Sequence, residues 1–150
     1  MKCLPPFLVA AAALAAAGCA NVADDVRARL QPDVAPHVQV FAADPKAAYA
    51  AALAALDQMD FRYTHGGPAQ GELEAISSIR HESDGDRQVS LAAEFRVAAD
   101  GGTEVSVRMK EAVEADPDAH LGQGVEGPLR DTPLYAVFFR AIDQELAARK

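Results

Sequence analysis

The segment from Val89 to Met109 places the strongest constraint on the fold. Apolar and polar side chains alternate from residue 89 to 97, which is the period of a strand with one buried face. Asp100-Gly101-Gly102 is typical of a hairpin turn, and the alternation then resumes. An antiparallel hairpin at or near the centre of a sheet is therefore predicted. Its inward-facing residues are Val89, Leu91, Ala93, Phe95, Val97, Val105, Val107 and Met109.

Two segments have the pattern of amphipathic helices, and both begin with the same pair of signals. Asp44-Pro45 precedes an apolar stripe that reaches Met59, and Thr132-Pro133 precedes one that reaches Leu146. A capping side chain accepts hydrogen bonds from first-turn N–H groups, and proline fits the first helical position. Each stripe predicts a face packed on a core. The predicted core residues are Tyr49, Ala52, Leu53, Leu56, Met59, Leu134, Tyr135, Phe138, Phe139, Ile142 and Leu146.

Shorter segments complete the predicted sheet. Residues 38–41 and 61–64 are rich in β-formers, and residues 71–80 predict a strand with Ile79 on its inner side. Residues 81–87 are polar and predict a loop. The order β-α-β-β-β-β-α predicts an α+β fold with a single twisted antiparallel sheet of about five strands and two helices packed on one face.

The first 18 residues have the composition of a signal peptide. Lys2 precedes an apolar run from Leu4 to Ala17, which ends in small residues before Cys19. The run is shorter than the roughly 20 apolar residues that a membrane-spanning helix needs. We therefore expect cleavage of this segment rather than a transmembrane anchor.

Ala16-Ala17-Gly18-Cys19 resembles the lipobox of bacterial lipoproteins, in which small residues precede a cysteine that becomes lipid-modified. Ala16 departs from the leucine preferred at its position. The resemblance implies lipidation of Cys19, and Ala20 in place of aspartate implies sorting to the outer membrane, on its periplasmic face. The alternative is ordinary signal cleavage after Ala17 or Ala20, which leaves Cys19 as an odd thiol or removes it.

Three regions follow from this interpretation. Residues 1–18 form the signal peptide, residues 19–37 the lipidated cysteine and a flexible tether, and residues 38–150 the α+β domain. The element order of the domain resembles the helix-grip-like domains of bacterial envelope lipoproteins, including small uncharacterised ones. This likeness implies a role in the cell envelope by analogy alone.

Charge and motifs narrow the function further. The chain has 14 basic and 22 acidic residues and a net charge of −8, which disfavours nucleic-acid binding. It has no Gly-x-Ser-x-Gly turn, phosphate-binding loop or paired-histidine zinc motif, so neither a catalytic residue nor a cofactor is expected. The serines of the predicted strands are interpreted as polar residues on a solvated sheet face. They are Ser77, Ser78, Ser90 and Ser106.

We therefore expect a tethered binding or assembly module with an envelope protein as its partner. Two alternatives remain: a cation-dependent or hydrolytic periplasmic enzyme, and a purely structural envelope lipoprotein. The enzyme alternative rests on two acidic runs that lack the spacing of a calcium loop. The weak metal candidates are Glu114, Asp116, Asp118 and His120 in one run, and His81, Glu82, Asp84 and Asp86 in the other.

The segment from Glu114 to Asp131 has no clear hydrophobic period and is long for a bare connection. We expect it to be a loop that carries recognition. The alternative is a lid over an open sheet edge or the end of the core, since exposed edges are commonly covered.

Overall fold

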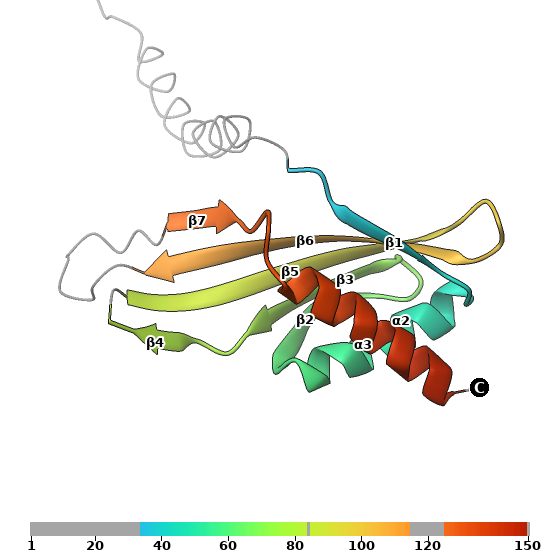
Figure 1. The fold of residues 1–150 in the computed structure, drawn as a ribbon, viewed down its shortest axis with the longest axis horizontal. Helices are drawn as coiled ribbons and strands as arrows, with labels where there is room; N and C mark the ends of the chain where they lie inside the picture. The colour runs from blue at the N-terminus through green and yellow to red at the C-terminus, as the bar shows by residue number, and fades with distance from the viewer. Residues whose placement is uncertain (1–33, 84, 115–124, 150) are drawn as a thin grey trace, which may run out of the picture. The chain divides into compact units, whose positions relative to one another are not determined.

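The computed structural model describes residues 34–83, 85–114 and 125–149, which lie within one compact unit, Val34–Lys150. They form an α+β domain with a seven-stranded antiparallel sheet and two helices (Figure 1). The elements in chain order are β1 (His37–Phe41), α2 (Pro45–Gln58), β2 (Phe61–Gly67), β3 (Glu72–Ser77), β4 (Arg80–Glu82), β5 (Gly85–Val97), β6 (Thr103–Glu114), β7 (Val125–Pro128) and α3 (Leu134–Ala148).

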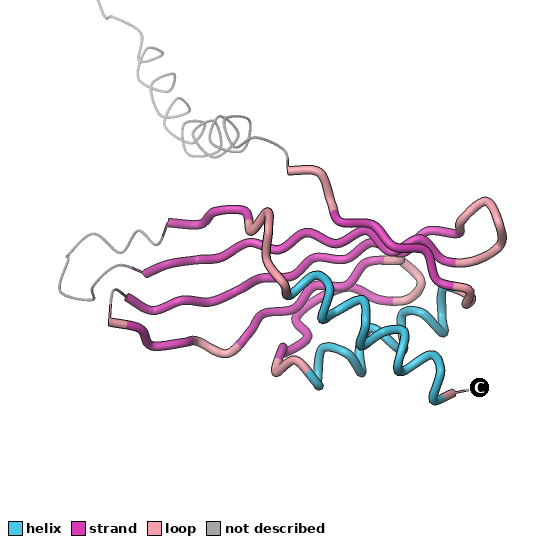
Figure 2. Tube along the Cα trace, viewed as in Figure 1, coloured by secondary structure: helices cyan, strands magenta, loops and turns pink. Residues whose placement is uncertain are grey.

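The predicted hairpin is the centre of the sheet. β5 and β6 pair continuously from Asp86 opposite Glu114 to Val97 opposite Thr103. The strand order is β1-β6-β5-β3-β2, while β4 also pairs with β5 and β7 also pairs with β6. β3 and β1 flank the hairpin at one end, and β4 and β7 flank it at the other. The helices lie near the former end, so in the described chain we call the latter the helix-free end (Figure 2).

Aromatic contacts join the helices to the sheet. Tyr49 of α2 lies 5.3 Å from Phe95 of β5 between ring centroids, and Phe139 of α3 lies 6.2 Å from Phe41 of β1. Burying a large apolar side chain contributes about 1.5–3 kcal/mol relative to leaving it exposed. The largest fully buried apolar side chains come from both helices and the central strands, so they form one core. They are Phe138, Leu56, Leu73, Leu91, Met109, Ile142, Val105 and Val107.

The two helix starts differ in the quality of their caps. Asp44 Oδ1 accepts hydrogen bonds from the backbone N–H groups of Lys46 and Ala47, each at 3.0 Å, which confirms the predicted cap. At α3, Thr132 Oγ1 accepts from Leu134 N at 3.4 Å, near the limit for a hydrogen bond. The prediction is therefore confirmed at α2 and wrong at α3, where the helix begins at Leu134, the N-cap position is Pro133 and no side chain of the described residues caps the helix.

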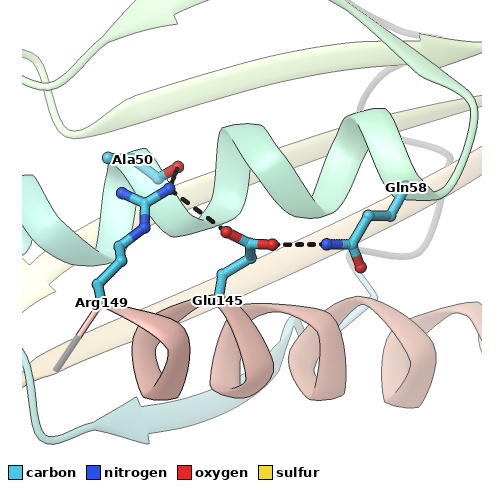
Figure 3. A network of polar contacts seen from close by, with 4 residues as sticks. All are labelled: Ala50, Gln58, Glu145 and Arg149. Carbon is cyan, nitrogen blue, oxygen red and sulfur yellow. Dashed lines mark hydrogen bonds and ion pairs between the residues drawn. The ribbon is translucent and has the colours of Figure 1, made fainter.

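Polar contacts hold the two helices side by side (Figure 3). Glu145 Oε1 accepts a 2.6 Å hydrogen bond from Gln58 Nε2, and Arg149 Nη2 lies 3.5 Å from Glu145 Oε2. Arg149 also donates to the backbone carbonyl of Ala50 at 3.1 Å. These groups lie near the surface, so each contributes modestly to stability and mainly aligns α3 along α2.

In two strands, the alternating series of buried side chains ends one inward position earlier than predicted. Ile79 is 54% exposed, because β3 ends at Ser77 and the chain leaves that register before β4 begins. Val97 is 71% exposed at the end of β5, where the hairpin turn starts. Both positions fit the alternation, but they lie at strand ends. The interpretation of Ser77 as solvated is also wrong, since the side chain is buried.

Two predicted loops contain strands. Residues 81–87 are not a loop, because β4 occupies residues 80–82 and β5 begins at Gly85. The segment Glu114–Asp131 is not irregular throughout, because Glu114 ends β6 and β7 pairs with β6 in register. These two short strands account for the difference between about five predicted strands and seven observed. Residues 115–124 lie outside the described chain.

Candidate interaction surfaces

The helix-free end of the hairpin brings together charged side chains from three strands. His81 Nδ1 on β4 lies 2.7 Å from Asp86 Oδ1 on β5. Asp86 is directly opposite Glu114 on β6. One residue from each acidic run, Asp86 and Glu114, therefore lies at this end of the sheet. Two facing carboxylates on paired strands repel each other.

Arg87 links acidic side chains on the other face of the same strands. Its Nε lies 3.1 Å from Glu82 Oε2, and its Nη1 lies 3.4 Å from Glu111 Oε2. The Arg87 side chain is 29% exposed, so water screens both pairs and each contributes about 0–1 kcal/mol. These ion pairs fasten β4 and β6 to β5 where no helix covers the described strands.

A hollow of about 260 Å³ lies at this end of the sheet. Its volume is at the lower limit for pockets that enclose small molecules. Part of its lining is the carboxylate pair described above, and part is the exposed Ile79. The lining residues are Ile79, Asp86, Arg87, Gln88, Ala112 and Glu114.

Four of the eight metal candidates belong to the described residues. Among residues 34–83, 85–114 and 125–149, no three His, Cys, Asp or Glu side chains are grouped closely enough to hold a metal ion. Glu114, His81, Glu82 and Asp86 belong to this set. Asp84, Asp116, Asp118 and His120 lie outside the described residues.

A second hollow, of about 520 Å³, lies between the end of α2, the start of β2 and the connection from β3 to β4. The buried Ser77 hydroxyl accepts a 2.9 Å hydrogen bond from Val89 N and donates one to the carbonyl of Ser78. The Ser77 hydroxyl thus takes the place of a backbone carbonyl as the acceptor for the N–H of Val89, at the point where β3 stops pairing with β5. The sequence signal for this role is weak, because a serine in an alternating strand is usually on the solvated face.

Asp60 lines the same hollow in an unusual backbone conformation. Its φ is 60°, the left-handed region that a non-glycine residue occupies at a cost. The Ser78 hydroxyl donates to Asp60 Oδ2. In the described chain neither this serine nor Ser77 is bonded to a histidine, so the hollow does not present a base-activated nucleophile.

The edge strands differ in how well they are protected from pairing with another chain. The register of β2 shifts between Tyr63 and His65, and such a bulge discourages edge pairing. β4 is three residues long and strongly polar, and β7 ends at Pro128. β1 pairs with β6 in an unbroken register from His37 to Phe41, and it carries no Asp, Glu, Lys or Arg.

The side chains of β1 alternate between the two faces of the sheet. On the helix side, the His37 ring stacks on Tyr135 at 3.7 Å, and Gln39 Nε2 donates to Asp143 Oδ2 at 3.1 Å. On the other side, Val38 and Val40 are 50% and 48% exposed. β1 therefore presents a regular, uncharged edge with two half-exposed valines.

Cys19 and the tether up to residue 33 lie outside the described residues. In the part of the chain that is described, neither helix is long and apolar enough to cross a membrane. No protein-family model matches the sequence, and the search of curated proteins found no significant match.

Proposed function

We propose that this protein is a lipid-anchored component of the bacterial envelope that binds or assembles with another protein and catalyses no reaction. Lipidation of Cys19 would hold it at the periplasmic face of the outer membrane. The single observation that carries this proposal is the apolar run from Leu4 to Ala17, which leads through Gly18 into Cys19. Three acyl chains on this cysteine would hold the protein stably at the membrane, since each methylene buried in the bilayer contributes about 0.8 kcal/mol to membrane binding.

The described domain supports a binding role. The two hollows described above are open and contain no paired nucleophile and base among the described side chains. By contrast, β1 offers an edge of the kind that binds an added strand through its backbone groups. A domain that begins at His37 would stand clear of the bilayer on the residues that follow Cys19.

We also propose that the domain is helix-grip-like, with both helices on one face of the sheet. Contacts of Tyr49 with Phe95 and of Phe139 with Phe41 support this arrangement. β4 and β7 are additions to the predicted element order. The assignment concerns architecture, and function follows from it only by analogy.

Metabolic labelling with palmitate tests the anchor, and the chain supplies its own control. The wild-type protein should incorporate label and fractionate with outer membranes, and Cys19→Ala should lose both properties. Cys3→Ala removes the other of the two cysteines and should change neither. Label retained by Cys19→Ala, or lost from Cys3→Ala, would contradict the anchor.

In-cell crosslinking followed by mass spectrometry tests the binding role separately. The wild-type chain should yield a reproducible crosslinked partner, which can be a second copy or another envelope protein. A chain that labels with palmitate and yields no specific crosslink would instead be a purely structural lipoprotein.

A further inference from the structure

We propose that β1 is the docking edge for a second copy of this chain, which pairs with it antiparallel about a twofold axis at Gln39. This proposal rests on the proposed binding role and names its partner. Two β1 strands paired in this way would join two sheets into one continuous sheet.

The sequence of β1 is complementary to itself in the antiparallel direction. With Gln39 opposite its symmetry mate, Val38 lies opposite Val40 of the second copy, and His37 lies opposite Phe41. Residues directly opposite on antiparallel strands point to the same face. The half-exposed valines of both copies therefore meet on one face as a single apolar patch, which is the complementarity that a twofold interface requires.

Charge repulsion between two copies is small at this edge. A net charge of −8 makes two copies repel over most of their surfaces, whereas β1 has no Asp, Glu, Lys or Arg. Glu104, opposite Val40 on β6, would lie three strand spacings across the sheet and two residues along the strand from its symmetry mate, roughly 16 Å away. That separation exceeds the screening length of about 8–10 Å at physiological salt.

One carboxylate next to the proposed axis already has a hydrogen-bond partner. Asp143 on α3 accepts a hydrogen bond from Gln39 Nε2 at 3.1 Å in each copy, which offsets repulsion between the two aspartates. Five residues on each side make a small interface, below the size of stable protein complexes. The expected dimer is therefore weak and concentration-dependent, and it is best detected by trapping.

Disulfide crosslinking between introduced cysteines tests both the existence of the dimer and the register of its strands. In antiparallel pairs, opposite Cα atoms lie about 4.5 or 5.5 Å apart, within the range that a disulfide spans. The full chain carrying Gln39→Cys, expressed in a Gram-negative envelope and mildly oxidised, should give a disulfide-linked dimer on a non-reducing gel. The wild-type chain, with Cys3 and Cys19, sets the background. Thr64→Cys, at an exposed position of the bulged β2 edge, is the matched control and should stay at that background.

Gln39→Cys removes a side chain on the proposed axis and could itself weaken the dimer. A second pair of variants therefore keeps Gln39. Val38→Cys and Val40→Cys, co-expressed with different tags, should form the mixed dimer in preference to either homodimer. In the proposed register residue 38 lies diagonally from its own mate, about 7–8 Å away, which is too far for an unstrained disulfide.

Background-level crosslinking of Gln39→Cys and of the mixed pair would overturn the proposal. Equal crosslinking of Gln39→Cys and Thr64→Cys would indicate random collision and would also overturn it. Preferential homodimers of Val38→Cys would contradict the register. These outcomes are independent of palmitate labelling, and a different crosslinked partner in cells would preserve the binding role while removing the second copy.

Discussion

The hydroxyl of Tyr135 joins three parts of the domain and provides the sharpest test of its packing. The side chain is 4% exposed, and its oxygen accepts a 2.9 Å hydrogen bond from the N–H of Met109 in β6. It donates a 2.8 Å hydrogen bond to the carbonyl of Leu129, just after β7. Tyr135→Phe removes only this oxygen and retains the ring that stacks on His37.

The size of the effect follows from the two lost bonds. The buried N–H of Met109 would be left without its partner from Tyr135, which costs about 1–3 kcal/mol. The carbonyl of Leu129 is only partly buried, so its lost bond costs about 0.5–1.5 kcal/mol. Together these terms predict a fall of about 1.5–4.5 kcal/mol in the free energy of unfolding. At roughly 4 °C per kcal/mol for a domain of this size, Tm should fall by about 6–18 °C.

Thermal and urea unfolding at neutral pH measure this change, with Tyr63→Phe as the matched control. Tyr63 is 43% exposed and donates to the carbonyl of Gly66, so water can replace its lost contacts and the expected cost is below about 1 kcal/mol. Equal stability losses in the two variants would refute the reasoning, as would a Tyr135→Phe protein within 0.5 kcal/mol of wild type, a tolerance set by ordinary surface substitutions.

Two further predictions concern a helix cap and a titrating group. Asp44→Ala should cost about 0.5–2 kcal/mol by urea unfolding, and Thr132→Ala should cost clearly less, because Asp44 makes two 3.0 Å bonds and Thr132 one at 3.4 Å; equal losses would contradict the cap geometry. Burial, with a smaller effect of the Tyr63 hydroxyl, raises the pKa of Tyr49 above 10.0. The associated stability is complete below about pH 10 and is lost as pH rises through the higher folded pKa, so alkaline unfolding curves of Tyr49→Phe should fall less steeply than wild type.

The central part of the fold could be predicted because its residues satisfy several local rules at once. The alternation from Val89 to Phe95, the Gly101-Gly102 turn and the cap at Asp44 each specify one structure without help from distant residues. The buried side chains of β5 and β6 accordingly match the prediction up to Phe95. The α+β class follows from these elements and is confirmed.

The prediction from the sequence was wrong where pairing with another strand determines the conformation. Arg80, His81 and Glu82 have neither alternating hydrophobicity nor strong β-propensity, yet they form β4 because β5 extends past the end of β3 and offers unpaired backbone groups. β7 forms in the same way beside the extension of β6. Tertiary pairing overrides propensity at both sites, and a pattern search limited to neighbouring residues does not detect it.

The candidate surfaces could be predicted even less, because each depends on which strands become neighbours. Asp86 and Glu114 are distant in the sequence and meet only through the β5–β6 register. Whether an edge is exposed is likewise a property of sheet order. From the sequence, the segment 38–41 is an ordinary short strand. In the structure it has β6 on one side and no described strand on the other, which makes it an edge. The lack of charge in β1 is notable only because β1 is an edge strand. The same residues in a central strand would be ordinary, since a central strand has no exposed edge to protect.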